Sequence, residues 1–210
     1  MSADRTNSVE LVGYYGGDLT HALSAWTSTS RDLTPDKIER IPKLLSMLAE
    51  NSHGTPFEKS SIHFLVVTDI ATHIQLLKHR ISSANAESAR YKELKDDKFY
   101  VPVDWPLEEK RLYIEHMEES FKKYHHCLNR LIAGGMSRSR AKESARMYLP
   151  YGNQITADIM FNFRSFAHFL GLRNTEHAQL EIRQLAQSML KLVKEIDGNP
   201  FEHTLAAFKL

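Results

Sequence analysis

A long run of apolar residues at helical spacing constrains the fold more than any other feature of this sequence. Between residues 107 and 132 the apolar side chains recur at steps of three and four: Ile114, Met117, Phe121, Tyr124, Leu128 and Leu131. This spacing puts them on one face of an α-helix, which we expect to be its buried face. Gly134 and Gly135 follow directly and are typical of a helix end.

Shorter patterns predict a mixed set of further elements. Runs rich in β-branched and aromatic residues predict strands at 9–15, 61–67 and 155–163. Helical spacing and capping residues predict helices at 19–26, 35–48 with a kink at Pro42, 69–80, 137–148, 164–172 and 175–197. Together they predict an α+β fold: a helix-rich single domain over residues 1–210 with a small central antiparallel or mixed sheet.

Composition excludes several classes of protein. Hydrophobic residues make up 42% of the 210 residues, so global disorder is not expected. A formal net charge of +1 argues against a dedicated duplex-DNA binder. Cys127 is the single cysteine, so no intramolecular disulfide can form, and we expect a cytoplasmic protein. The sequence contains no run of about 18 apolar residues, so no membrane span is expected. The first seven residues have no apolar core and do not resemble a signal peptide.

The segment from Gln75 to Tyr91 concentrates polar groups. Lys78, His79 and Arg80 fall in the last turn of the helix expected at 69–80, where the helix dipole favours cations. From residue 81 to 91 there is no apolar stripe, so we expect a loop. Within it, Arg90 can fork two hydrogen bonds to a phosphate or carboxylate, and Ser88 can donate one more. The segment therefore predicts an anion-binding loop.

The same segment closely resembles the signature of flavin-dependent thymidylate synthases, Arg-His-Arg-x-x-Ser-x-Asn-Glu-x-Ser-x-Arg-Tyr. The positions that match in register are His79, Arg80, Ser83, Asn85, Ser88, Arg90 and Tyr91. Lys78 stands where arginine is usual, and Ala86 where glutamate is usual, with Glu87 one place later. Further stretches resemble the family at 53–58, 145–150 and 162–179, so the likeness runs from about residue 53 to 181.

The resemblance implies reductive methylation of dUMP to dTMP, with methylenetetrahydrofolate as carbon donor, FAD as cofactor and NADPH as reductant. It implies a homotetramer with sites shared between subunits, and no nucleic-acid or membrane partner. The nucleotide would be held by Gln75, Lys78, Glu87, Ser88, Arg90, Arg146 and Arg173, of which Arg173 would be catalytic. FAD would be held by Thr55, Lys78, His79, Arg80, Asn162, Arg164, His168 and His177, with His53 on the folate side. Segments 53–100 and 137–181 would thus carry the site.

Other interpretations stay open at this stage. A non-catalytic nucleotide- or RNA-binding protein could use Lys78, Arg80 and Arg90, and an inactive paralogue could retain flavin despite Ala86. A metal site is not expected, because adjacent His125 and His126 point about 100° apart on a helix. Cys127 lacks the basic surroundings of a thiolate nucleophile.

Overall fold

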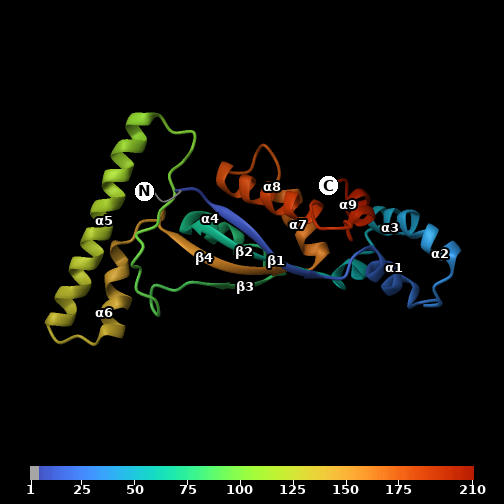
Figure 1. Cartoon of the computed structure of the whole chain (residues 1–210), viewed down its shortest axis with the longest axis horizontal. Coiled ribbons are helices and arrows are strands. Elements are labelled where there is room, and N and C mark those ends of the chain that lie inside the picture. Colours follow the sequence, from blue (N-terminus) through green and yellow to red (C-terminus); the bar gives the residue numbers. More distant parts are fainter. Residues whose placement is uncertain (1–4) are drawn as a thin grey trace. The chain divides into compact units, whose positions relative to one another are not determined.

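The computed structural model describes residues 5–210 (Figure 1). The first four residues of the N-terminal segment, which we did not expect to be a signal peptide, lie outside the described residues. The strands are β1 (Ser8–Tyr15), β2 (Ser61–Asp69), β3 (Ser83–Ala86) and β4 (Gln154–Phe161). They form one antiparallel sheet in the order β1-β2-β4-β3. A helix-rich α+β fold with a small antiparallel sheet is therefore confirmed.

The helices confirm most of the expected segments. They are α1 (Asp18–Trp26), α2 (Pro35–Glu39), α3 (Ile41–Glu50), α4 (Ile70–Leu76), α5 (Leu107–Ala133), α6 (Arg138–Ala145), α7 (Phe163–Arg173), α8 (Leu180–Lys194) and α9 (Glu202–Ala207). Two short 3-10 helices, η1 (Thr55–Glu58) and η2 (Arg146–Tyr148), complete the set. Among residues 5–210, no helix combines the length and the apolar character that a membrane crossing requires.

The chain divides into two compact units. Among the described residues, unit 1 comprises 5–8, Val66–Leu77 and Asn85–Ala157, and unit 2 comprises Val9–Leu65, Lys78–Ala84 and Asp158–Leu210. The expectation of a single domain over the whole chain stays a prediction.

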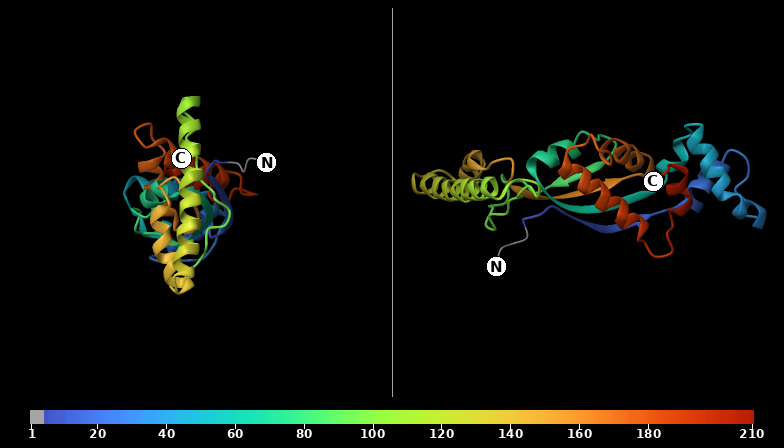
Figure 2. Two further views of the ribbon diagram at one scale, coloured as in Figure 1. Left: turned by 90° about the vertical axis from the view of Figure 1, so that its left-hand side faces the viewer. Right: turned by 90° about the horizontal axis from the view of Figure 1, so that it is seen from above.

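The core of unit 1 lies along α5, whose neighbour α6 runs beside it (Figures 1 and 2). Tyr124 and Leu128 of α5 pack against Ala141 and Ala145 of α6. The small alanines allow the two helices to approach closely, which explains why α6 lies flat against α5. The expected face of α5 is largely confirmed, although Ile114 and Leu131 are only partly buried.

The core of unit 2 is aromatic. Phe163, Phe166 and Phe169 of α7 are fully buried. Phe163 stacks on Phe201 at 5.5 Å between ring centroids, and Phe169 stacks on Phe161 at 5.4 Å. Burying each of these rings contributes on the order of 1.5–3 kcal/mol. This buried face fixes the direction in which the opposite, polar face of α7 points.

The helix expected at 69–80 is shorter than predicted. It begins as expected, because Asp69 Oδ1 accepts a hydrogen bond from Thr72 N at 2.8 Å and caps α4. It ends at Leu76, and the expected stripe is not its buried face: Ile74 and Leu77 are 40% and 49% exposed. Lys78, His79 and Arg80 therefore lie beyond the helix, so their expected place in its last turn was wrong.

Three further expectations need correction. The segment 81–91 is not all loop, because residues 83–86 form β3. The helix expected from Thr175 begins at Leu180, after a turn in which Ala178 N donates to Thr175 O. The segment 35–48 is two helices, since α3 restarts at Ile41 with Pro42 in its first turn.

Candidate functional site

In unit 2, a hollow of about 470 Å³ collects side chains from three segments that are far apart in sequence. We call it the α7 hollow. Its lining residues are Glu58, Lys78, His79, Arg80, Ile81, Asn162, Arg164, Ser165, His168, Leu172 and Arg173. Most of the side chains that the sequence predicts at the flavin, together with the predicted catalytic arginine, therefore share one space. Its volume is within the range of small-molecule sites.

Helix α7 presents one wall of this hollow. Asn162 caps the helix, since its Oδ1 accepts a hydrogen bond from Ser165 N at 2.8 Å. Arg164, His168 and Leu172 follow at steps of four, which places them one above another on the polar side of the helix. The phenylalanines on the opposite side are buried, so the polar face is held toward the hollow.

The α7 hollow carries an excess of positive charge. Lys78, Arg80, Arg164 and Arg173 all line it. Among the described residues lining it, Glu58 alone is acidic, and its Oε1 accepts a hydrogen bond from Arg164 Nη1 at 2.5 Å. The remaining cations suit a ligand with phosphate groups.

Arg173 is held by a neutral histidine. Its Nε donates to His79 Nε2 at 3.1 Å, which requires an unprotonated nitrogen on the imidazole. His79 is buried, and its ring packs edge-on against Phe169 at 4.9 Å. Burial, followed by the nearby charges of Arg173 and His168, lowers the pKa of His79 to about 4. At neutral pH His79 is therefore an acceptor that fixes the orientation of Arg173.

A second hollow in unit 2, of about 680 Å³, lies at η1. We call it the η1 hollow. It is lined by His53 and Thr55, by apolar side chains that include Trp26 and Met47, and by Arg164, which also lines the α7 hollow. A Cβ atom at Gly54 would lie 2.5 Å from Arg164 Nε, so the glycine permits this close approach. The predicted folate-side residue and Thr55 thus share a space that adjoins the α7 hollow through Arg164.

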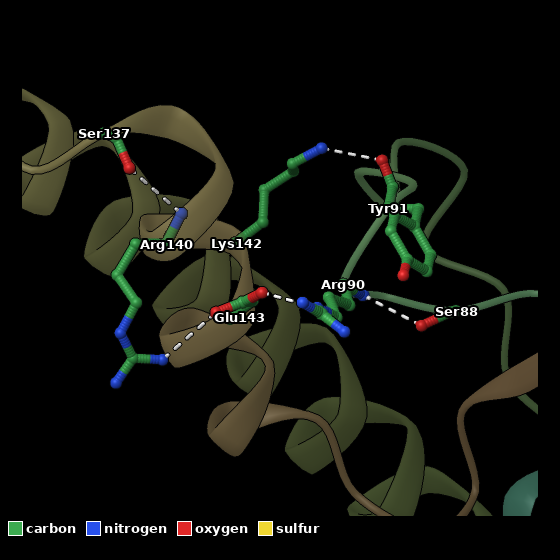
Figure 3. A network of polar contacts seen from close by, with 7 residues as sticks. All are labelled: Ser88, Arg90, Tyr91, Ser137, Arg140, Lys142 and Glu143. Carbon is green, nitrogen blue, oxygen red and sulfur yellow. Dashed lines mark hydrogen bonds and ion pairs between the residues drawn. The ribbon is translucent and has the colours of Figure 1, made fainter.

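In unit 1, the predicted anion-binding loop is held against α6 (Figure 3). Tyr91 N and Lys92 N both donate to Ser88 O, at 3.0 and 2.9 Å, so the loop turns tightly at this point. Arg90 Nε donates to Glu143 Oε1 at 2.6 Å, and Lys142 Nζ donates to Tyr91 O at 2.6 Å. The sequence did not single out Lys142 or Glu143, although they lie just before the matched segment 145–150.

Glu87 has a structural task in the same unit. Its Oε2 accepts a hydrogen bond from Thr156 N at 3.0 Å, its Oε1 accepts one from Lys92 Nζ at 2.5 Å, and its own N donates to Thr156 O. Burial alone would raise the pKa of Glu87, but the hydrogen bonds from Lys92 and Thr156 outweigh it and lower the pKa. Glu87 therefore extends the pairing of β3 with β4, and its predicted contact with the nucleotide stays a prediction.

The structure does not gather every predicted residue. Arg146 is exposed at the start of η2, and Gln75 is half-buried on α4, both in unit 1. His177 is exposed between α7 and α8, and it is not among the described residues that line either hollow of unit 2. Within residues 5–210, no group of three or more His, Cys, Asp or Glu side chains is placed to hold a metal ion.

Comparison with known proteins identifies the family. Residues 10–197 match the family model described as "Thymidylate synthase complementing protein". The chain belongs to this family. It is 33% identical over 195 residues to the flavin-dependent thymidylate synthase of Pseudothermotoga lettingae, which covers 90% of this chain and 85% of that protein. The resemblance that the sequence motifs predicted is therefore confirmed.

Solved structures agree with this assignment. The crystal structure of the UMP/dUMP methylase PolB from Streptomyces cacaoi, bound with 5-Br dUMP, has a TM-score of 0.80 and 28% identity, covering 97% of this chain and 94% of that one. The same methylase bound with 5-Br UMP has a TM-score of 0.79 and 29% identity, covering 97% and 93%. The fold of the thymidylate synthase complementing family thus extends over nearly the whole chain.

Proposed function

We propose that this chain catalyses the reductive methylation of dUMP to dTMP, with methylenetetrahydrofolate as carbon donor, FAD as bound cofactor and NADPH as reductant. The α7 hollow is the observation that carries the proposal. It brings the matched residues of 78–80 together with those of 162–173, as a shared ligand requires. The names of the relatives point to the same chemistry.

The donor set of the α7 hollow fits FAD. The cations Lys78 and Arg80 suit a diphosphate, Arg164 lies in the same hollow paired with Glu58, and Ile81 and Leu172 offer apolar surface for a ring. Bound FAD supplies the electron-transfer chemistry of the reaction, and the protein supplies binding and orientation. We further propose Thr55, Asn162, His168 and His177 as flavin contacts and His53 as the folate-side residue.

For the nucleotide, we propose Ser88, Arg90 and Arg146 as contacts of the phosphate side, with Gln75, Lys78 and Glu87 as further contacts. Ser88 is not proposed as a nucleophile, because its Oγ accepts a hydrogen bond from Arg90 N at 3.3 Å and, among the described residues, no basic side chain is hydrogen-bonded to it.

Arg173 is proposed as the catalytic residue, at the uracil ring. Neutral His79 holds its guanidinium at 3.1 Å, so the cation is oriented before the substrate arrives. A preorganised cation stabilises negative charge that develops on the ring as it is activated.

Two measurements test the proposal. The absorption spectrum of the purified protein should show bound flavin and should change when dUMP is added. Tritium release from dUMP labelled at C5 should require methylenetetrahydrofolate and NADPH. A flavin-binding protein that releases no tritium would be an inactive paralogue, and a colourless protein that ignores dUMP but binds RNA would support the non-catalytic alternative.

UMP is a second candidate substrate. The Streptomyces cacaoi protein is a UMP/dUMP methylase, and its crystal structures hold a brominated analogue of each nucleotide. Competition between labelled dUMP and UMP, measured as the ratio of kcat/KM values, decides which nucleotide this chain prefers.

We also propose a homotetramer in the cytoplasm. Beside Arg146, the side chains of Met147, Tyr148 and Tyr151 are exposed in the single chain. Apolar side chains grouped in this way are typical of a protein–protein interface.

A further inference from the structure

Arg90 is engaged on only one edge of its guanidinium. Its Nε donates to Glu143 Oε1 at 2.6 Å, while the side chain as a whole is 55% exposed. Within the described residues, no side chain or backbone group accepts a hydrogen bond from Nη1 or Nη2, the two terminal nitrogens of Arg90. Those nitrogens form the end of a planar fork that matches two oxygens of a phosphate.

The position of this fork is fixed from several sides (Figure 3). Glu143 holds its edge, and the ring of Tyr91 lies 5.2 Å from the central carbon of the guanidinium. Lys142 Nζ binds Tyr91 O, which fixes the backbone next to Arg90. Two consecutive residues of α6 therefore hold both the side chain and the adjoining backbone of the loop.

Glu143 also has a second cationic neighbour. Arg140 Nη1 lies 3.5 Å from Glu143 Oε2, so one carboxylate stands between two guanidinium groups. The cluster of Arg90, Arg140 and Glu143 has a net positive charge, because two guanidinium groups outnumber one carboxylate. It therefore still attracts anions. A fixed arginine binds an anion more tightly than a free one, because less rotamer freedom is lost on binding.

We propose that Glu143 is a positioning residue that holds Arg90 with its terminal nitrogens directed to the phosphate of the substrate nucleotide. The inference rests on the proposed function, since it takes a nucleoside monophosphate as the ligand of Arg90. It adds a residue that the sequence motifs do not include, and it assigns α6 a role in the preorganisation of the nucleotide site.

The test compares dUMP with deoxyuridine, which has no phosphate, as ligands of the flavin-loaded protein. Glu143→Ala should weaken the binding of dUMP about tenfold, and leave deoxyuridine binding and kcat at saturating dUMP unchanged. Glu143→Gln keeps a carbonyl oxygen that can accept from Arg90 Nε, so it should weaken dUMP binding only about two- to threefold. Glu108→Ala is the control, because it removes a different carboxylate of unit 1, an exposed one, that pairs with an arginine, Arg111.

The outcomes separate the two hypotheses. Wild-type protein that neither binds nor converts dUMP overturns the proposed function, and this inference with it. Wild-type protein that converts dUMP while Glu143→Ala binds it equally well overturns the inference alone. Tighter dUMP binding by both Glu143 variants would show that the carboxylate competes with the phosphate, which is the opposite of positioning. An equal loss for dUMP and deoxyuridine would show general damage to the fold and also reject the inference.

Discussion

The contact between Arg173 and His79 joins a predicted catalytic cation to a buried neutral acceptor. Removing a preorganised cation that faces developing charge costs about 3–4 kcal/mol of transition-state stabilisation. Arg173→Ala should therefore lower kcat about a hundredfold or more, while the flavin spectrum stays that of bound cofactor. Arg183→Ala is the control, because it removes a half-buried arginine of α8 in the same unit that hydrogen-bonds Glu176 O and lines neither hollow among the described residues. Near-normal dTMP formation by Arg173→Ala would refute the catalytic role.

His21 makes the stability of unit 2 depend on pH. It is fully buried, with Nδ1 at 2.9 Å from Thr204 Oγ1 and Nε2 at 2.8 Å from Ser60 Oγ. Thr204 Oγ1 donates to Asp18, so His21 Nδ1–H donates to Thr204 and Nε2 accepts from Ser60. Burial lowers the pKa of His21 to about 4, so this histidine is neutral in the fold.

The sign of the effect follows from this lowered pKa. The unfolded chain takes up the proton near pH 6.5, whereas the folded chain resists it until about pH 4. The contribution of neutral His21 to the free energy of unfolding is therefore complete above pH 6.5. It is lost as the pH falls from 6.5 toward 4, by up to about 3 kcal/mol. Urea unfolding between pH 7.5 and 5 should show this loss. The His21→Gln variant should show a shallower dependence, and equal slopes for the two proteins would contradict the assignment.

At the scale of the element, the sequence predicts what local spacing determines. Helix α5 is predicted within one residue at its C-terminal end, since the apolar spacing from Ile114 to Leu131 and the two glycines after it leave little ambiguity. Helix α4 is mispredicted, because its apolar spacing does not mark its buried face. Helix α9 was not predicted, because the residue that caps it lies far away in the sequence. The carboxylate of Asp18 accepts hydrogen bonds from His203 N and Thr204 N, across more than 180 residues.

Strand β3 was not predicted, because local spacing does not mark it either. What holds it to the sheet can be tested. Its four residues are all exposed, so no alternation marks it, and Glu87 closes its pairing with β4. Glu87→Ala leaves Thr156 N without this acceptor and should lower the free energy of unfolding by about 1–2 kcal/mol. Asp96→Ala is the control: it removes an exposed carboxylate whose Oδ2 lies 3.8 Å from Lys98 Nζ, and it should change the free energy of unfolding little. If Glu87→Ala unfolds at the wild-type urea concentration, the carboxylate does not hold the strand.

At the scale of the whole molecule, the motifs predict a set of site side chains but not the residues that hold those side chains in place. The hydrogen bond between Arg173 and His79 spans 94 positions, and that between Arg90 and Glu143 spans 53. No spacing rule reaches that far, because such pairs are decided by how helices and loops pack. The cations were recognisable from the sequence, whereas the neutral state of His79 became apparent only from its burial.

The proposed tetramer gives the last prediction. Met147 and Tyr151 are 81% and 69% exposed in the single chain, next to the predicted nucleotide contact Arg146, and burying such side chains is worth roughly 25 cal/mol per Å². For the tetramer that the family resemblance implies, light scattering after gel filtration should give four times the 24.1 kDa mass of one chain. Met147→Asp should lower that mass and reduce turnover, since a buried unpaired carboxylate is costly. Leu107→Asp, at a position 85% exposed outside this cluster, should keep both. An active Met147→Asp protein with an unchanged mass would place the subunit interface elsewhere.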